Sequence, residues 1–357
     1  MRTFIHLRTA LLSLGLLLAH SGAQGRGAEE VFTVNPTGAA RTLNGAGSTF
    51  AAPIIKEWMR VYGGEHPDLG LSYAVVGSGA GIDRFLAGTV DIGATDAPLT
   101  PADVAKVKGD VLQIPVTAGM IAITYNLPTV KGPLNLPRAV YPDIFQDKIV
   151  RWDDPRIAAA NPGVALPHKL IQVVTRRDSS GTTFAFTNHL AAVSPAWAAG
   201  LGVAKALDWP GGAMTAPGNE GVAQRIKLTE GSIGYVESGF AERLGLPLAW
   251  LENRAGGFIV PTVETGQRAL TGGSDTIPEA LHVMITDPEG ARSYPIVTYT
   301  WLLLRRQYDD PVKTAAIKDL VGWILTQGQA RAEPLRFVPL PANITQAAQG
   351  ELATLGE

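Results

Sequence analysis

The feature that most constrains this chain is a regular alternation of short apolar runs with helix-like segments. Residues 71–77 (LSYAVVG) and 170–178 (LIQVVTRRD) have the composition of strands. The segments 80–88 and 181–193, which follow them, carry apolar residues at helical spacing. Such alternation is typical of an α/β fold in which helices flank mainly parallel sheets.

Two further segments are long and rich in β-forming residues. They are residues 111–127 (VLQIPVTAGMIAITYNL) and 293–306 (SYPIVTYTWLLLRR), and we expect Pro115 and Gly119 to divide the first of them into two strands. We interpret the two segments as paired crossovers between two domains, which the chain length also favours at about 150 residues per domain. Residues 24–117 and 297–357 would form one lobe, and residues 118–296 the other.

The two ends of the mature chain are expected to differ in character. Residues 24–40 form a polar lead-in. Residues 312–333 have apolar positions at helical spacing and are expected to form the final helix.

The first 23 residues have the properties of a targeting segment. Arg2 and Arg8 make the first residues positively charged, and the apolar run 10–19 (ALLSLGLLLA) follows them. Residues 21–23 (SGA) then offer small side chains for cleavage. The run is too short to span a bilayer of about 30 Å. We therefore expect a signal peptide that is cleaved near Ala23 and directs the protein to the periplasm or the medium.

Charge and cysteine content exclude several classes of protein. The chain has 30 Lys and Arg against 32 Asp and Glu, and loss of residues 1–23 removes two arginines, which leaves 28 against 32 and a net charge of −4. Nucleic-acid binding is therefore not expected, and any anion site must be built locally. The chain has no cysteine, which excludes disulfides, thiol catalysis and lipid attachment through cysteine, so we expect a protein free in the periplasm.

Four stretches place small or hydroxylated residues between the end of a strand and the start of a helix. They are residues 45–53 (GAGSTFAAP), 75–82 (VVGSGAGI), 91–99 (DIGATDAPL) and 176–184 (RRDSSGTTF). Helix N-termini bind anions through unpaired N–H groups and the helix dipole, while glycine allows close approach and hydroxyls add donors. One such stretch alone is an ordinary helix cap. Four of them, one with two arginines, favour an oxyanion site.

Asp96 is unexpected beside an anion, because two negative groups repel each other. One interpretation is that Asp96 caps the helix that follows it. The other is that its carboxylate accepts a hydrogen bond from a ligand that keeps a proton, which would select phosphate over sulfate.

A serine nucleophile is the enzymatic alternative for the stretch 176–184. Ser180 lacks the G-x-S-x-G elbow, and no histidine has a spacing that would pair with it, although triad partners meet in space rather than in sequence. No metal-binding or nucleotide-binding motif is present, so neither a metal nor a cofactor is expected.

The motifs together resemble those of the periplasmic phosphate-binding proteins of high-affinity bacterial phosphate ABC transporters. The resemblance runs in order from about Leu43 to residues 339–341 (PLP). It is carried by LNGAGSTFAAPIIKEW, GSGAGI, VDIGATDAPL, KIVRWDDPRIAAANPG, VVTRRDSSGTTFAFTNHL, GNEGV and GSIGYVE. It implies a two-lobed periplasmic-binding-protein fold of type II with two hinge crossovers. It also implies a monomer without enzymatic activity that closes on inorganic phosphate and delivers it to an inner-membrane phosphate ABC permease.

The resemblance also implies which residues hold the anion. The phosphate-binding residues would be Ser48, Thr49, Phe50, Ser78, Asp96, Arg176, Ser180, Gly181 and Thr182. Asp178 would orient the guanidinium of Arg176, which matches the family's arginine because it lies four positions before Ser180. The role of Arg177 is open. The chain departs from the family at Ser179, where glycine is common, and at Gly79 and Ala80, where serine and glycine are common.

Alternative functions keep the same fold or the same site. The ligand could be another oxyanion such as sulfate, molybdate or arsenate. The protein could scavenge phosphate or act in adhesion without a transporter, or it could be a secreted hydrolase or phosphatase that uses Ser180.

Overall fold

The structure, a computed structural model, describes residues 29–107, 110–272, 281–282 and 284–357. The expected signal peptide lies outside the described residues. Among the helices of the described ranges, none has both the length and the apolar character needed to cross a membrane.

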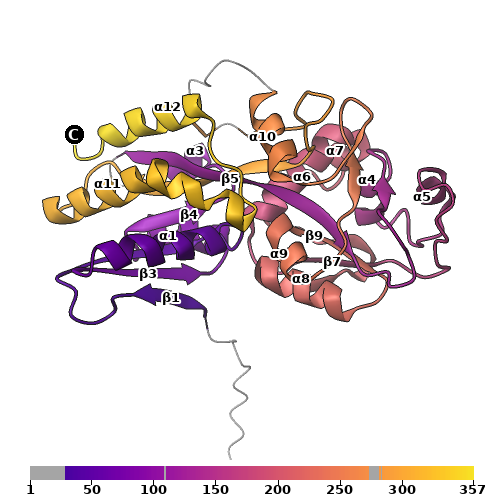
Figure 1. The fold of residues 1–357 in the computed structure, drawn as a ribbon, viewed down its shortest axis with the longest axis horizontal. Coiled ribbons are helices and arrows are strands. Elements are labelled where there is room, and N and C mark those ends of the chain that lie inside the picture. Colours follow the sequence, from indigo (N-terminus) through magenta and orange to yellow (C-terminus); the bar gives the residue numbers. More distant parts are fainter. Residues whose placement is uncertain (1–28, 108–109, 273–280, 283) are drawn as a thin grey trace, which may run out of the picture.

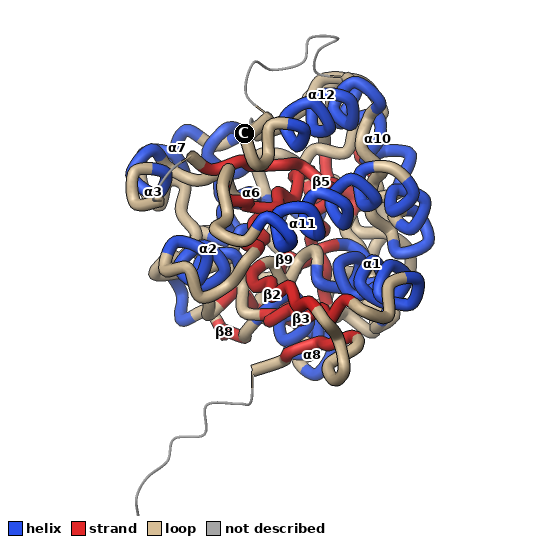
Figure 2. Tube along the Cα trace, turned by 90° about the vertical axis from the view of Figure 1, so that its left-hand side faces the viewer, coloured by secondary structure: helices blue, strands red, loops and turns tan. Residues whose placement is uncertain are grey.

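The described residues form two α/β lobes that lie side by side (Figure 1). Lobe I contains strands β1 (Val31–Val34), β2 (Arg41–Gly47), β3 (Leu69–Val75) and β4 (Ile92–Thr95) and helices α1 (Ala52–Glu65), α2 (Ser78–Leu86), α3 (Pro101–Val104), α11 (Pro311–Leu325) and α12 (Ala342–Ala353). In Figure 2, α1 and α2 lie on opposite sides of strands β2 and β3, so both faces of this sheet are covered.

Lobe II is built from the middle of the chain. Its strands are β7 (Gln172–Arg176), β8 (Met214–Ala216) and β9 (Ser232–Glu237), with a small sheet of β6 (Asn135–Leu136), β10 (Trp250–Glu252) and β11 (Phe258–Ile259). Its helices are α4 (Tyr141–Phe145), α5 (Pro155–Ala159), α6 (Gly181–Val193), α7 (Pro195–Ala199), α8 (Gly218–Leu228), α9 (Ser238–Arg243) and α10 (Val263–Thr271). Among the described residues, short 3-10 helices cover Pro210–Gly212 in lobe II and, after α11 in lobe I, Gln327–Arg331 and Glu333–Leu335.

The strands of both lobes join in one curled sheet with the order β1-β3-β2-β4-β12-β5-β9-β7-β8. β2 pairs in parallel with β3 and β4, and β7 pairs in parallel with β8 and β9. Between these two parallel groups lie the long antiparallel strands β5 (Val111–Tyr125) and β12 (Val297–Arg305). The expected α/β fold with two crossovers is therefore confirmed.

The expectation that Pro115 and Gly119 divide residues 111–127 into two strands is wrong, because β5 is continuous. Pro115 lies opposite Trp301 at a register shift in the pairing with β12, and a bulge is a position where a strand accepts proline. Gly119 is required for close packing, since a Cβ atom there would lie 2.7 Å from Cζ of Phe50. Both residues thus serve the continuous strand.

The ends of the chain also differ from expectation. The polar lead-in contains β1, which pairs antiparallel with β3 at the edge of the sheet. Helix α11 ends at Leu325 instead of reaching residue 333, and α12 follows it as the last helix. The Gly328 carbonyl accepts a hydrogen bond of 2.8 Å from the Trp58 indole N–H, so the segment after α11 packs against α1 as short 3-10 turns.

The apolar core extends through both lobes along β5. In lobe I, Trp58 of α1 is buried against the segment that follows α11. In lobe II, the rings of Phe186 and Tyr235 stack with centroids 4.3 Å apart and contact Phe145. These cores fix the strand ends from which the candidate site projects.

Candidate functional site

The four stretches singled out in the sequence meet where the two lobes face each other. Each follows the carboxyl end of a strand: β2 leads to Ser48 and Thr49, β3 to Ser78, and β4 to Asp96. β7 ends at Arg176 and leads to Ser180 at the start of α6. Ligands of α/β proteins bind at this edge of the sheet, because the helix N-termini point toward it.

Asp96 lies at the centre of the lobe I part of the site and is 1 % exposed. Its Oδ1 accepts hydrogen bonds from the hydroxyls of Ser48 at 2.6 Å and Thr300 at 2.7 Å, and its Oδ2 accepts one from Ser78 at 3.3 Å. Burial raises the pKa of Asp96 to about 6, although these hydroxyls and the charge of Arg176 favour its ionised form. The interpretation of Asp96 as a helix cap is wrong, because Thr100 caps α3.

Arg176 supplies the buried positive charge of lobe II, with a side chain 1 % exposed. Its Nε donates to Asp178 Oδ1 at 2.9 Å, a second nitrogen contacts Asp178 Oδ2, and Nη1 donates to Thr182 Oγ1 at 3.1 Å. Burial alone would raise the pKa of Asp178, but the hydrogen bonds and charge of Arg176 outweigh burial and lower it. Asp178 therefore remains ionised and holds the guanidinium in place. Arg177, in contrast, is exposed.

The N-terminus of α6 points at the lobe I cluster. Ser180 is its N-cap, and the Ser180 Oγ accepts a hydrogen bond of 3.1 Å from the Thr183 N–H. A Cβ atom on Gly181 would lie 2.5 Å from Ser78 Oγ and 2.8 Å from Asp96 Cβ, so only glycine allows this approach. The N–H groups of Gly181 and Thr182 precede the first hydrogen bond within the helix, so they are oriented to donate to an anion.

No histidine among the described residues hydrogen-bonds Ser180. The buried His189 pairs with the Tyr141 hydroxyl at 2.7 Å, and His168 pairs with Asp153. The arrangement of Ser180 is therefore that of a helix cap rather than that of a nucleophile with a base. Within the described ranges, no group of three His, Asp or Glu side chains is placed to hold a metal ion.

The three residues that follow β2, Ser48, Thr49 and Phe50, differ in their contacts. The Ser48 N–H donates to the Ala94 carbonyl at 2.9 Å, so Ser48 acts on Asp96 through its hydroxyl. The Thr49 hydroxyl faces lobe II. The ring of Phe50 is fully buried against Gly119 and, edge to face, against Phe337, which fixes the backbone of the turn.

The two departures from the family pattern lie against each other across the lobes. The Gly79 N–H donates to the Ser179 carbonyl at 3.0 Å. A Cβ atom on Gly79 would overlap the Ser179 side chain, so the serine of lobe II fits because lobe I has glycine at this point. A Cβ atom on Gly77 would similarly overlap the Asp178 carboxylate. The lobes are therefore in a closed arrangement.

Two residues of the site were missed in the sequence. Thr300 of β12 donates to Asp96, and a threonine within a β-rich run carries no signal of its own. Asn219 of α8 is fully buried and bonds Thr49 and Thr182, although the sequence offered only its place in the GNEGV motif.

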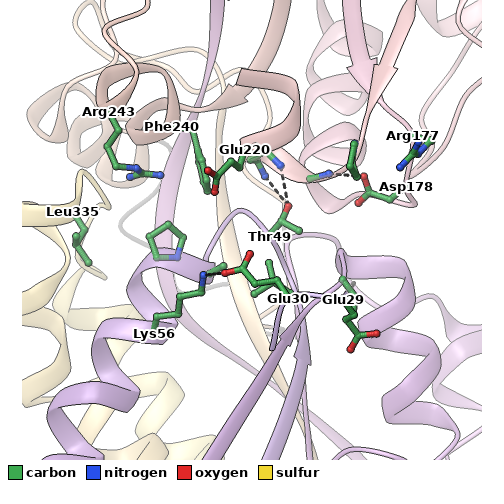
Figure 3. A pocket seen from close by; sticks show the side chains of 17 residues that line it. Glu29, Glu30, Thr49, Lys56, Arg177, Asp178, Glu220, Phe240, Arg243 and Leu335 are labelled. Carbon is green, nitrogen blue, oxygen red and sulfur yellow. Dashed lines mark hydrogen bonds and ion pairs between the residues drawn. The ribbon is translucent and has the colours of Figure 1, made fainter. Parts of the chain in front are cut away.

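A cleft of about 650 Å³ between the lobes leads to this cluster (Figure 3). Thr49, Asp178 and Asn219 line it, whereas Asp96, Ser78, Arg176, Ser180 and Thr182 are buried behind it. Its remaining charged residues have mixed sign and include an ion pair of Lys56 with Glu30. The arrangement is that of a two-lobed binding protein with a buried polar site between its lobes.

A family model described as the PBP superfamily domain matches residues 33–327, which agrees with this class. A protein of Pasteurella multocida (strain Pm70) named phosphate-binding protein PstS is 37 % identical over 316 residues, which cover 88 % of this chain and 91 % of the relative. The chain therefore belongs to the PstS family within the PBP superfamily.

Solved structures share the fold. A high-affinity periplasmic phosphate-binding protein (PfluDING) bound with phosphate superposes with a TM-score of 0.70 at 21 % identity, covering 87 % of this chain and 93 % of that chain. An ABC-type phosphate transport receptor from Vibrio cholerae superposes with a TM-score of 0.56 at 17 % identity, covering 84 % of this chain and 100 % of that chain.

Proposed function

We propose that this protein captures inorganic phosphate between its two lobes and delivers it to an ABC-type phosphate permease. The observation that carries the proposal is that a buried carboxylate of lobe I, Asp96, and a buried guanidinium of lobe II, Arg176, lie in one cluster with serine and threonine hydroxyls. The names of the curated relatives support phosphate as the ligand.

The residues predicted from the sequence would contact the anion through different chemical groups. Arg176 supplies charge-assisted hydrogen bonds to the anion, with Asp178 holding its guanidinium. The N–H groups of Thr49, Phe50, Gly181 and Thr182 and the hydroxyls of Thr49, Ser180 and Thr182 donate to its oxygen atoms. The Ser78 hydroxyl would exchange its 3.3 Å bond to Asp96 Oδ2 for a bond to the anion. Ser48 acts indirectly, through its bond to Asp96.

Asp96 would select the ligand by its proton. Above its pKa of about 6, the carboxylate accepts a hydrogen bond from a phosphate that keeps a proton. Sulfate is fully ionised at neutral pH, so one of its oxygen atoms would face the carboxylate without a proton between them. An unpaired polar contact of this kind in a buried site can give discrimination of about 10⁴–10⁵. Arsenate is protonated like phosphate and would be accepted by the same carboxylate.

Binding would close the lobes about a hinge formed by β5 and β12. The lobes would comprise residues 24–117 with 297–357, and residues 118–296. The contact of Gly79 with Ser179 belongs to the closed form.

The cellular setting follows from the same proposal. The protein acts in the periplasm after loss of its signal peptide, as a monomer, and performs no catalysis. The permease is its partner, as an ABC-type phosphate transport receptor of the same fold suggests.

Calorimetric titration of the mature protein with phosphate, sulfate and arsenate tests the proposal. We expect tight binding of phosphate and binding of sulfate that is weaker by at least about 10³-fold, because an unpaired polar contact in a buried site can give discrimination of about 10⁴. Equal affinities for phosphate and sulfate would contradict it. Hydrolysis of a chromogenic phosphate ester that disappeared in Ser180→Ala would instead support the hydrolase.

A further inference from the structure

Asn219 lies at the start of α8 and connects the threonines of the two lobes. Its Nδ2 donates to Thr49 Oγ1 of lobe I at 3.0 Å and to Thr182 Oγ1 of lobe II at 3.1 Å. Asn219 is completely buried, and Thr182 is completely buried as well. Figure 3 shows the hydrogen bonds that reach the Thr49 hydroxyl from the opposite lobe.

The orientation of the Asn219 amide is fixed by its other contact. Its Oδ1 accepts a hydrogen bond of 2.9 Å from the backbone N–H of Glu237. A backbone N–H can only donate, so the oxygen of the amide must lie on that side. The NH₂ group must therefore point toward the two threonines, and its two hydrogens are divided between them.

Each threonine oxygen also receives a second donor. Thr49 Oγ1 accepts from the backbone N–H of Asn219 at 3.3 Å, and Thr182 Oγ1 accepts from Arg176 Nη1 at 3.1 Å. A hydroxyl oxygen has two lone pairs, so both acceptor positions of each threonine are occupied. Among the described residues, neither threonine hydrogen has an acceptor, and each hydroxyl can act only as a donor to something else.

We propose that Asn219 is a positioning residue that sets the direction of both hydroxyls, so that Thr49 and Thr182 donate their hydrogens to the bound oxyanion. The inference rests on the proposed function, since it assumes that an oxyanion lies between these threonines. Asn219 itself does not touch the ligand, because the protein uses both ends of its amide. Its bond to Thr182 lies within lobe II, whereas its bonds to Thr49 form only in the closed form, where lobe I brings Thr49 to α8.

The variant Asn219→Asp tests this assignment with little change of shape. One carboxylate oxygen keeps the bond from the Glu237 N–H, and the other replaces the NH₂ group and accepts from the threonine hydroxyls. Both hydrogens then turn away from the anion. Each hydroxyl bond to a charged ligand contributes about tenfold or more to affinity, so phosphate should bind at least about 100-fold more weakly.

Asn188→Asp is the matched control. Asn188 of α6 donates through its own Nδ2 to the Thr286 hydroxyl at 2.7 Å, outside the site. The same exchange of amide for carboxylate there should leave the phosphate affinity within about twofold of wild type, as expected for a screened surface charge.

A double-mutant cycle separates hydroxyl direction from simple charge repulsion. In a Thr182→Val background one of the two hydroxyls is already absent, so Asn219→Asp should cost about tenfold less there than in the wild-type background. The same fold-loss in both backgrounds would overturn the inference. If the aspartate variant does not fold, the cycle is run with Asn219→Ala, and additivity with Thr182→Val would overturn it equally.

The experiment also distinguishes this inference from the proposed function. A wild-type protein that binds phosphate, together with an Asn219→Asp variant of equal affinity, would overturn the role of Asn219 alone. A wild-type protein that binds no phosphate would overturn the proposed function, and this inference with it.

Discussion

Replacing Asp96 by asparagine changes one atom of the buried cluster and should alter both ligand selectivity and stability. The hydroxyls of Ser48 and Thr300 donate to Asp96 Oδ1 at 2.6 and 2.7 Å, so the asparagine oxygen will take that position. Its NH₂ group then replaces Oδ2, and an acceptor in the site becomes a donor.

The effect on selectivity can be worked from that exchange. Phosphate loses the acceptor for its proton, a hydrogen bond to a charged group that contributes about 1.5–3 kcal/mol, while sulfate gains a donor. The ratio of phosphate to sulfate affinity should fall by about 10- to 150-fold. Calorimetric titration of wild type and Asp96→Asn with both anions measures this ratio. An unchanged ratio would refute the role of Asp96 as the acceptor of the ligand's proton.

The same exchange should weaken ligand selectivity but increase the stability of the folded protein at neutral pH. Burial raises the pKa of Asp96 from its usual 3.8 to about 6, so the folded state binds this proton more tightly than the unfolded chain does. The anion-free protein therefore loses about 3 kcal/mol of stability as the pH rises from 4 to above 6. Asp96→Asn removes the buried charge and should be the more stable protein at pH 7, with a smaller difference at pH 4. Urea denaturation at both pH values measures it, and a difference independent of pH would contradict the argument.

Three further predictions follow from the same contacts. Arg176→Ala should weaken phosphate binding by at least about 100-fold in calorimetry, because it removes several charge-assisted donors. Replacement of the exposed Arg177 by alanine should change the affinity by about threefold or less, and the reverse order would show that the wrong arginine has been assigned. Gly79→Ala should hold the lobes apart and weaken phosphate binding, because the added Cβ atom would overlap Ser179. Adding Ser179→Gly to this variant should restore both the affinity and the closed radius of gyration measured by X-ray scattering, and no rescue would argue against the contact. Sulfate affinity should rise as the pH falls through about 6, because protonated Asp96 becomes a donor, and a flat pH profile would count against that assignment.

The sequence predicts those parts of the fold and site that depend on local pattern. The strand ends at Thr95 and Arg176 and the helix start at Gly181 lie where the alternation of apolar runs and small residues places them. The distinction between Arg176 and Arg177 rests on the match to the family's motif, and in the structure only Arg176 is buried in the cluster. Whether these residues hold phosphate stays a prediction.

The parts that could not be predicted depend on partners far away in the sequence. Thr300 reaches Asp96 across 204 residues, and Asn219 reaches Thr49 across 170, so no local pattern marks either of them. The continuity of β5 through Pro115 depends on a bulge in its pairing with β12, which exists only in the folded sheet.

A crystal structure of the mature protein with phosphate tests the central claim most directly. We expect one phosphate between the lobes, with an oxygen atom within about 2.5–3.0 Å of the Asp96 carboxylate. Its other oxygen atoms should lie within hydrogen-bond distance of the Arg176 guanidinium and the N–H groups at the start of α6. A phosphate bound elsewhere, or one that contacts Arg176 but not Asp96, would contradict it.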